Sequence, residues 1–494
     1  MASILALDQG TTGSTALVVH QDGTVLGRGY RELTQHFPRP GWVEHDADEI
    51  FRVTVEAARE AIAAANDPPL AIGISNQRET VVLWDRATLA PVAPAIVWQD
   101  RRTTARCREL EAAGMQPLIR ARTGLVIDPY FSATKLEWLL RDPAIRRRAE
   151  RGQLAAGTID SWLVARLTGG RVHVTDRTNA SRTMLCDLAR GAWDDELLAL
   201  FSVPRSILPE IVASSGAAGA TDGTHFGGEL PISGIAGDQQ SALFGQACVR
   251  AGMAKNTYGT GVFLLVHTGD AVAEPPAGVL ATAACGPRGE PAFAFEGSVL
   301  VAGAAVQWLR DGLGLIARAS ETEALARSVP DAGGVHFVPA FAGLGTPHWA
   351  PEARGTITGL TRGTTRAHLV RATLESMAFS SADLLEAMEG PGRQVPFLRV
   401  DGGASANDWL MQFQADVCGR PVERPSQVET TALGAAALAG IAAGTWRDAD
   451  DFAAARAPTR FEPSIDAAER DALRRGWQRA VNATLAWARD RSGA

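Results

Sequence analysis

Two short turns rich in glycine and threonine, each lying between apolar runs, constrain this chain most. The first spans residues 8–12, after the apolar run 4–7 and before the run 15–19. The second spans residues 258–261, about 250 positions later, and leads into the apolar run 262–266. Short apolar runs bounded by turn residues predict buried strands, and glycine supplies the backbone angles of a tight hairpin. We therefore expect two similar β-hairpins, one in each half of the chain.

These turns also suit a chemical task. A turn of small residues lets backbone N–H groups approach phosphate oxygens, and a carboxylate at the end of the preceding strand can hold Mg²⁺. Asp8 stands at that place in the first turn. A single Gly-Thr turn is usually only a hairpin, but its repetition favours a duplicated ATPase that holds a nucleotide from two sides.

The length of 494 residues exceeds what one hydrophobic core normally fills, so two or three domains are expected. We place the boundary near residue 248, which gives domains 1–248 and 249–494 with a ligand cleft between them. The net charge of −7 gives no reason to expect nucleic acid or an anionic membrane as partner. Alternating strands and helices along the chain predict α/β layers.

The five cysteines are scattered without metal-type spacing, which predicts reduced thiols in the cytosol. The chain begins without a positively charged leader, and the alanine-rich run 432–444 is too short to span a bilayer. That run is predicted to be a buried helix. We expect a cytoplasmic protein without membrane insertion.

Helix boundaries are indicated at two places. Asp46 and Glu49 have the spacing of a capping box at a helix that ends near residue 66. Ser464 is the expected N-cap of a C-terminal helix. The apolar stripe of that helix, which should belong to the core, consists of Leu473, Trp477, Val481 and Leu485.

Lysine is nearly absent from the chain. Of the 48 basic residues only Lys135 and Lys255 are lysines. A compact ammonium and a planar guanidinium differ in tight sites, so each lysine is either specially required or an ordinary surface residue with its charge in water.

Candidate ligand-binding residues follow two of the apolar segments. Arg78 and Glu79 come after the run 70–75, and Trp98 follows another apolar segment. Loops at strand ends of α/β sheets commonly bind ligands. Arginine, glutamate and tryptophan together offer a small polyol donors, acceptors and an apolar wall.

Asp238 follows the predicted strand 231–237. A carboxylate there can accept the proton of a hydroxyl that attacks phosphorus, or it can be the N-cap of the next helix, and the two roles can coexist. In the segment 401–407, adjacent glycines permit close approach of a ribose or ring, and Asn407 can hydrogen-bond a base.

Several of these segments together resemble the bacterial glycerol kinases. The resembling strings are residues 6–12, 40–46, 76–80, 124–131, 178–184, 237–240, 256–261 and 399–403, nearly collinear from about 3 to 490. Residues 355–375 also resemble the signature of the wider carbohydrate kinase family. That resemblance implies two actin-like, ribonuclease H-like ATPase domains related by duplication.

The resemblance further implies transfer of the ATP γ-phosphate to glycerol, giving sn-glycerol 3-phosphate for glycerol uptake and catabolism, by a homodimer or homotetramer. Asp238 would be the base and Asp8 would organise Mg²⁺. Glycerol would be bound by Arg78, Glu79, Trp98, Tyr130, Asp238, Gln239 and Phe263. The nucleotide would contact Thr11, Thr12, Gly13, Thr260, Gly303, Gln307, Gly403 and Asn407.

This sequence departs from its relatives at three places. The first turn continues Gly13-Ser14-Thr15 where relatives have Ser-Ser-Arg, so one basic nucleotide contact is either missing or supplied by another part of the chain. Glu229 replaces an arginine that some relatives use for fructose 1,6-bisphosphate, and an acid there would repel that effector. His225 lies near the position of a regulatory phosphohistidine in other relatives, with a spacing one residue short.

Three alternatives remain open at this point. The substrate could be dihydroxyacetone or a pentulose, as in related sugar kinases. The chain could also be an actin-like scaffold or chaperone ATPase with no phosphate acceptor, although such proteins do not need the predicted polyol residues. A degenerate homologue kept for regulation is disfavoured by the intact motifs of both halves.

Overall fold

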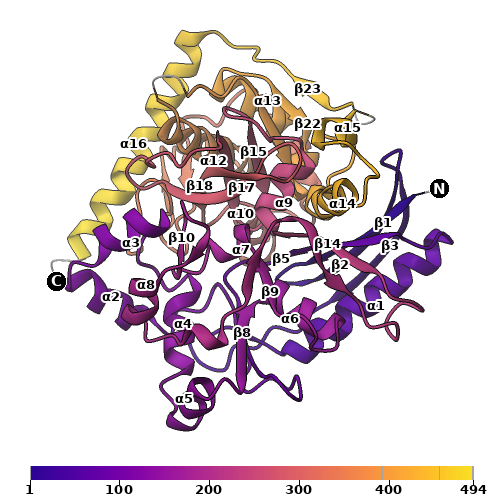
Figure 1. Ribbon diagram of the computed structural model, residues 1–494. Helices are drawn as coiled ribbons and strands as arrows, with labels where there is room; N and C mark the ends of the chain where they lie inside the picture. The colour runs from indigo at the N-terminus through magenta and orange to yellow at the C-terminus, as the bar shows by residue number, and fades with distance from the viewer. Residues whose placement is uncertain (1, 391–392, 455–456, 492–494) are drawn as a thin grey trace.

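The protein is described by a computed structural model that covers residues 2–390, 393–454 and 457–491. Two large mixed β-sheets dominate it, with helices between and around them (Figure 1). The first sheet combines indigo strands from the start of the chain with the magenta strands β13 and β14, and the second sheet is formed by later residues, up to the yellow end of the colour range. The predicted α/β class is therefore confirmed.

The first sheet has six strands in the order β13-β14-β5-β1-β2-β3. Their bounds are β1 Ser3–Gln9, β2 Gly13–His20, β3 Val25–Glu32, β5 Ala71–Asn76, β13 Ser215–Ala220 and β14 Pro231–Gly237. Strands β1, β2 and β3 form an antiparallel meander, whereas β5 runs parallel to β1 and β14 parallel to β5. The predicted first hairpin is thus β1–β2.

The second sheet has seven strands in the order β17-β18-β16-β15-β21-β22-β23. Their bounds are β15 Ala254–Tyr258, β16 Val262–Gly269, β17 Leu280–Cys285, β18 Pro291–Val299, β21 Leu398–Asp401, β22 Val422–Arg424 and β23 Thr459–Phe461. Strands β15, β16 and β18 are antiparallel neighbours, with β17 on the outer side of β18, and β21 and β22 follow in parallel beside β15. The two sheets therefore share one plan, as expected of a duplication.

The helices are α1 Ala47–Ala65, α2 Thr104–Ala112, α3 Gln116–Thr123, α4 Ser132–Leu139, α5 Pro143–Glu150, α6 Ile159–Leu167, α7 Arg177–Ala180, α8 Asp195–Leu200, α9 Asp238–Gly245, α10 Gly303–Gln307, α11 Glu321–Arg327, α12 Arg366–Met388, α13 Asp408–Cys418, α14 Thr430–Ala442, α15 Ala449–Ala453 and α16 Ala467–Arg491. Short strands complete the fold: β4 Glu44–His45, β6 Val81–Asp85, β7 Ala95–Ile96, β8 Leu154–Thr158, β9 Val174–Asp176, β10 Cys186–Asp187, β11 Ala192–Trp193, β12 Glu210–Val212, β19 His336–Val338 and β20 Thr356–Thr358.

Helix α14 is the buried alanine-rich helix that the sequence predicts, and it packs against the first sheet although it belongs to the C-terminal half. Figure 1 shows α14 and α9 between the two sheets. The backbones come very close, since a Cβ at Gly73 of β5 would lie 2.0 Å from the carbonyl oxygen of Ala435. A helix of the C-terminal half is thus packed directly against the sheet of the N-terminal half. The proposed domain boundary near residue 248 stays a prediction.

Local signals had mixed outcomes. Asp46 caps α1 as predicted, accepting hydrogen bonds from the backbone N–H groups of Asp48 and Glu49. The prediction for Ser464 was wrong, because Asp466 accepts from the backbone of Glu469 at the start of α16, while the Ser464 hydroxyl bonds Asp416. The apolar stripe of α16 does pack into the hydrophobic core beside the second sheet, as predicted.

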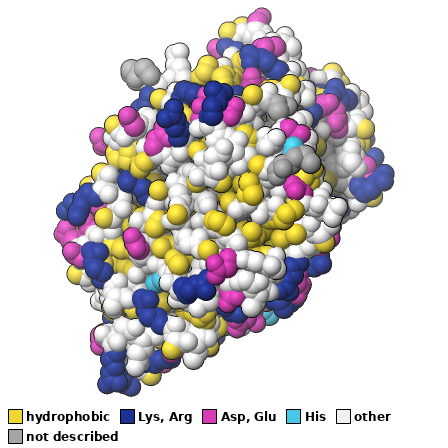
Figure 2. Space-filling view, turned by 45° about the vertical axis from the view of Figure 1, so that its right-hand side comes forward, with side chains coloured by type: hydrophobic (Ala, Val, Ile, Leu, Met, Phe, Trp, Pro, Cys, Tyr) yellow, Lys and Arg dark blue, Asp and Glu magenta, His cyan; other side chains and the backbone are white. Residues whose placement is uncertain are grey.

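Cys107, Cys186, Cys248, Cys285 and Cys418 are all free thiols. Among the residues described, no helix combines the length and apolarity needed to cross a membrane. Figure 2 shows basic and acidic side chains interspersed over one face of the molecule. Many are paired, as in the exposed Arg205–Asp195 contact of 2.6 Å, so the two signs of charge balance locally.

Candidate active site

Three predicted site segments meet at one edge of the first sheet. Asp8 lies near the end of β1, Arg78 follows β5 and Asp238 follows β14. These strands are parallel neighbours, and their registers pair Asp8 with Ser75 and Gly237 with Asn76. Because the carboxyl ends of parallel strands lie side by side, residues separated by up to 230 positions come together, and this edge is the candidate site.

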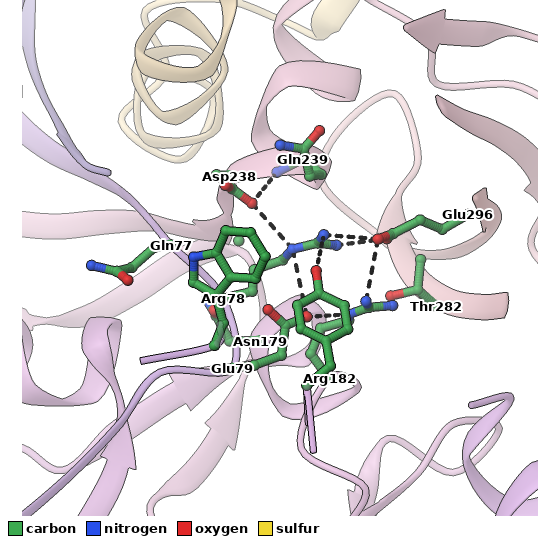
Figure 3. Close-up of polar contacts among 12 residues, drawn as sticks. Gln77, Arg78, Glu79, Asn179, Arg182, Asp238, Gln239, Thr282 and Glu296 are labelled. Carbon is green, nitrogen blue, oxygen red and sulfur yellow. Dashed lines mark hydrogen bonds and ion pairs between the residues drawn. The ribbon is translucent and has the colours of Figure 1, made fainter. Parts of the chain in front are cut away.

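Arg78 lies at the centre of a buried ion cluster (Figure 3). Its Nη1 and Nη2 donate to the two carboxylate oxygens of Glu296, at 2.6 and 2.8 Å. The same two nitrogens also donate to Gln240 and to the Tyr130 hydroxyl, while Nε faces Asp238 Oδ1 at 3.1 Å. The guanidinium is therefore fixed on all sides, and it aligns the predicted base.

Arg182 is the second guanidinium of this cluster and is fully buried. Its Nε donates to Glu79 Oε1 at 2.6 Å, and its Nη2 donates to Glu296 Oε1 at 3.2 Å. Glu296 thus receives two arginines, which hold its carboxyl pKa at about 2 despite burial. Buried charges of this kind persist only when each is closely paired.

The charge of Glu79 is balanced less fully by the two arginines than the charge of Glu296. Burial raises its pKa, and the nearby Glu296 adds to that effect against the two arginines. Its Oε2 makes no hydrogen bond or ion pair with another described residue. The backbone φ of 62° is unusual for a side chain of this size and marks a strained, functionally constrained position. Oε2 is therefore available to accept a ligand hydroxyl.

Asp238 is the first residue of α9 and not its N-cap, which is Gly237. The N-cap alternative was wrong because the carboxylate turns toward Arg78 instead. Its Oδ1 accepts from the backbone of Gln239 at 2.7 Å and pairs with Arg78, whereas Oδ2 has no partner among the described residues. With its side chain 30% exposed, Asp238 presents one oriented and unoccupied oxygen.

An aromatic wall borders these charges. Trp98 meets Tyr130 edge-on with ring centroids 5.5 Å apart, and it meets Phe263 at 6.4 Å. Trp98 and Tyr130 come from segments near the first sheet and Phe263 from the second, so both halves build the wall. The indole Nε1 of Trp98 also donates to the Thr11 hydroxyl at 2.8 Å, which ties the wall to the first glycine turn.

Both lysines are buried, so the surface alternative for them was wrong. The Lys135 ammonium donates to three backbone carbonyls, those of Pro129, Tyr130 and Phe131, at 2.6, 2.7 and 3.2 Å. Lys255 donates to the Gln239 side chain and, at 2.8 Å, to the Thr257 hydroxyl. Each ammonium fixes a segment that carries a predicted glycerol ligand.

The first turn closes through a hydrogen bond from Gly10 N to Gly13 O at 2.9 Å. Thr12 is exposed at its tip. Gly13 is buried in β2, where a Cβ would lie 2.5 Å from the Arg31 carbonyl oxygen, so packing against β3 already requires a glycine. Its nucleotide contact stays a prediction.

The second turn is packed against two other predicted nucleotide segments. Gly303 N donates to Gly259 O at 3.0 Å, and Ala302 N donates to Thr260 O at 2.8 Å. A Cβ at Gly402 would lie 2.4 Å from the Tyr258 carbonyl oxygen, so the turn 401–403 is equally close. Thr260, Gly303 and Gly403 are therefore brought together around one turn.

Asn407 and Gln307 stand at the borders of this group. The Asn407 Oδ1 caps α13 by accepting from Leu410 N at 2.9 Å, and its Nδ2 lies 3.4 Å from the Thr322 hydroxyl. Gln307 is exposed at the end of α10, one helical turn after Gly303. Both groups of the Asn407 amide thus have one protein partner, and each has one further hydrogen-bonding position for a nucleotide.

Asp8 has the electrostatic surroundings of a cation site. Burial raises the pKa of Asp8 to about 7, and the nearby carboxylates of Asp238 and Glu429 contribute to the rise. In the described part of the chain, no group of three or more His, Cys, Asp or Glu side chains is arranged to hold a metal ion. A cation at Asp8 would therefore depend on water and phosphate oxygens for its remaining ligands.

Glu296 and Arg182 were not predicted as functional residues. Glu296 lies in β18, whose other residues are apolar, glycine or serine. One carboxylate inside an otherwise apolar strand is a signal of a buried ionic partner, and it could have indicated Glu296. Arg182 lies within the resembling string 178–184, but its geometry depends on contacts 103 and 114 residues away.

The loop that follows β13 contains the two regulatory departures. Glu229 Oε1 lies 3.7 Å from the exposed Arg171, which gives that acid a local cationic partner. The backbone carbonyl of His225 accepts from Arg59 at 2.9 Å, and the imidazole packs edge-on against Phe51. Whether this loop binds an effector or a phosphate stays a prediction.

A cavity of about 330 Å³ lies elsewhere, between the C-terminal end of α9 and β21–β22. Gln246, Arg399, Glu423 and Thr430 are among its lining residues. It contains none of the predicted site residues, so the candidate active site is defined by the side-chain contacts above and not by this cavity.

Comparison with known proteins identifies the family. Residues 3–245 match the N-terminal domain, and residues 254–443 the C-terminal domain, of the FGGY family of carbohydrate kinases. The chain is 55% identical over 491 residues to glycerol kinase of Carboxydothermus hydrogenoformans, covering 98% of both chains. It is 56% identical over 494 residues to glycerol kinase of Trichlorobacter lovleyi, covering 99% of this chain and 100% of that one.

Solved structures extend the likeness to three dimensions. The structure of Plasmodium falciparum glycerol kinase with ADP is 36% identical, with a TM-score of 0.91 and 98% of each chain covered. Xylulose kinase of Lactobacillus acidophilus has the same fold, with a TM-score of 0.88 at 21% identity over 98% of this chain and 99% of that one. The duplicated sheets, the two glycine turns and these matches together show that the chain belongs to the FGGY family of carbohydrate kinases.

Proposed function

We propose that this protein is a glycerol kinase, which transfers the γ-phosphate of ATP to a primary hydroxyl of glycerol and forms sn-glycerol 3-phosphate and ADP. The observation that carries this function is the placement of Asp238. Its free Oδ2 stands at the sheet edge beside Arg78 and Glu79, next to Asp8 of the first glycine turn. Relatives that are 55% identical over nearly the whole chain are glycerol kinases.

The polar groups of the site suit a small triol. Glu79 Oε2 is free to accept from one hydroxyl, and the Gln239 amide can donate to another. Trp98 and Phe263 offer an apolar surface for the CH₂ edge. These contacts support, as our proposal, glycerol binding by Arg78, Glu79, Trp98, Tyr130, Asp238, Gln239 and Phe263.

In the transfer step the glycerol oxygen attacks the γ-phosphorus as its proton passes to Asp238 Oδ2. The bond from that phosphorus to the β–γ bridging oxygen breaks, and ADP leaves with the bridging oxygen. Such reactions depend mainly on alignment and charge neutralisation, which the fixed Arg78 guanidinium supports by holding the carboxylate in place.

The nucleotide is proposed to lie across the two glycine turns, with Asp8 holding Mg²⁺ partly through water. The mutual repulsion of Asp8, Asp238 and Glu429 supports a cation at this place. When bound, Mg²⁺ would neutralise charge on the phosphate oxygens. The close approach of Gly303 and of Gly402, the neighbour of Gly403, to the second turn supports a nucleotide contact there.

The product carries a phosphate charge and cannot diffuse through a bilayer, which supports a cytoplasmic role in trapping glycerol for catabolism. A homodimer or homotetramer is part of the same proposal, and sedimentation velocity would test it.

The deciding experiment is ADP formation from Mg-ATP with a panel of glycerol, dihydroxyacetone and xylulose. Glycerol is expected to give the highest kcat/KM, and the product should be oxidised by an enzyme specific for sn-glycerol 3-phosphate. Turnover with xylulose but none with glycerol would assign a pentulose kinase, and ATP hydrolysis without any acceptor would favour the scaffold alternative.

Adding fructose 1,6-bisphosphate to the glycerol assay should leave the rate unchanged, because Glu229 would repel it.

A further inference from the structure

Lys255 connects the second sheet to the glycerol site of the first. It lies in β15, and its ammonium reaches α9, where it donates to Gln239 Oε1. A second hydrogen bond, to Thr257 Oγ1, measures 2.8 Å. Lys255 is fully buried and Gln239 is 7% exposed, so this contact is an internal one and not a surface pairing.

The contact decides which way the Gln239 amide faces. A primary amide has one acceptor oxygen and one NH₂ donor group, and its two orientations differ little in shape. With Oε1 accepting from an ammonium, Nε2 must lie on the opposite side of the amide. Figure 3 shows the Gln239 side chain extending from the same helical turn as Asp238 and pointing away from Arg78. Lys255 thus holds the oxygen, and the NH₂ group is the part of the amide that has no partner among the described residues and can donate to a ligand.

The surroundings of Lys255 explain why a lysine stands here in a chain that otherwise uses arginine. Asp401, Asp238 and Glu296 attract its charge, while the nearby Arg78 repels it. A compact ammonium can approach Gln239 and Thr257 in a fully buried space, whereas a planar guanidinium needs more room and a different donor geometry. Only two of the 48 basic residues are lysines, and both are buried in the site segments.

We propose that Lys255 is a positioning residue for the glycerol site, fixing the Gln239 amide so that its Nε2 donates to a glycerol hydroxyl. This inference rests on the proposed glycerol kinase activity. It makes the second sheet part of the acceptor site, since a residue of β15 sets the polarity of a contact made by α9. We therefore expect the site to prefer a substrate that has, at that position, an oxygen able to accept a hydrogen bond from Gln239.

A double-mutant cycle tests this role. Lys255→Met should raise the KM for glycerol by about ten-fold, as expected for loss of a buried hydrogen bond that orients a ligand group, with the KM for ATP unchanged. Gln239→Ala should raise the KM for glycerol similarly. In the Gln239→Ala background, Lys255→Met should then change the KM for glycerol by less than about two-fold, because its effect passes through Gln239.

Two further variants separate positioning from packing. Lys255→Gln keeps an N–H donor and should recover part of the glycerol KM, whereas Lys255→Arg should not. Arg52→Met, on the exposed face of α1, removes a cation far from the site and should match the wild type. Thermal unfolding and ADP binding of each variant report folding independently, and Lys255→Gln carries the test if Lys255→Met does not fold.

The outcomes are distinct. Effects of Lys255→Met and Gln239→Ala that multiply in the double variant, or full activity of Lys255→Arg, would overturn the positioning role. If the wild type fails to phosphorylate glycerol, the proposed function itself falls. Wild-type activity with multiplying effects removes only the role of Lys255.

Discussion

Arg78 and Glu296 form a two-point ion pair, Nη1 to Oε2 at 2.6 Å and Nη2 to Oε1 at 2.8 Å, between residues 218 positions apart. Arg78 follows β5 of the first sheet and Glu296 lies in β18 of the second. The pair therefore links the two sheets at the active site, and the same guanidinium aligns Asp238. One guanidinium thus contacts both the second sheet and the carboxylate that we propose as the base.

Replacing Glu296 with glutamine should destabilise the protein strongly. The change leaves Arg78 and Arg182 without their shared carboxylate, and breaking a buried ion pair costs about 3–5 kcal/mol. Urea unfolding at pH 7 measures the loss. Glu323→Gln, in the exposed pair with Arg327, is the control and should cost less than about 1 kcal/mol.

The cost of Glu296→Gln should depend on pH. The arginines lower the pKa of Glu296 from 4.5 to about 2 in the folded protein. A carboxyl group with a lowered pKa stabilises the fold above its unfolded pKa, and this contribution is lost as the pH falls toward the folded value. The stability difference between wild type and variant should therefore narrow below pH 4.5, and a constant difference from pH 7 to pH 3.5 would contradict this account.

Asp238→Asn should reduce kcat by about 100-fold or more, the usual contribution of a general base. The amide keeps the shape of the side chain but cannot accept the glycerol proton, so ADP binding measured by calorimetry should be retained. Asp195→Asn, at the exposed start of α8, is the matched control and should leave kcat unchanged. Undiminished transfer by Asp238→Asn would exclude it as the base.

Two glycine-to-alanine changes in the proposed nucleotide site should differ in their effect on stability. A Cβ at Gly303 would lie 2.5 Å from the Gly259 carbonyl oxygen, so Gly303→Ala should shift the second turn, raise the KM for ATP and lower the melting temperature. A Cβ at Gly403 meets nothing within 4 Å, so Gly403→Ala should raise the KM for ATP without loss of stability. An unchanged KM for ATP in Gly403→Ala would place the nucleotide elsewhere.

Asp8→Asn should raise the Mg²⁺ concentration needed for half-maximal activity, because the asparagine removes the carboxylate proposed to organise the cation. Removing one of three mutually repelling acids should not lower stability in metal-free buffer. Activity titrated with Mg²⁺ at saturating ATP, together with thermal unfolding in EDTA, measures both effects. A wild-type Mg²⁺ requirement in the variant would exclude Asp8 from the metal site.

The fold was predictable because its signals are local. Glycine and the flanking apolar runs at residues 8–12 and 258–261 predict the two hairpins, and Asp46 indicates where α1 begins. The N-cap predictions for Asp238 and Ser464 were wrong, because each side chain has a partner that is distant in the sequence. The Asp238 carboxylate pairs with Arg78 and does not cap α9. The Ser464 hydroxyl hydrogen-bonds Asp416, and Asp466 accepts from the backbone at the start of α16 instead.

By itself the sequence determined the duplicated α/β plan and the family, and it singled out Arg78, Glu79 and Asp238 as site candidates. Each of these inferences depends on short contiguous segments of the chain. Only the tertiary structure decided which oxygens of Glu79 and Asp238 remain free, that Glu296 and Arg182 complete the ion cluster, and that both lysines are buried. Those facts depend on contacts between distant strands, and a charge buried in the interior is set by the partners that the fold brings to it.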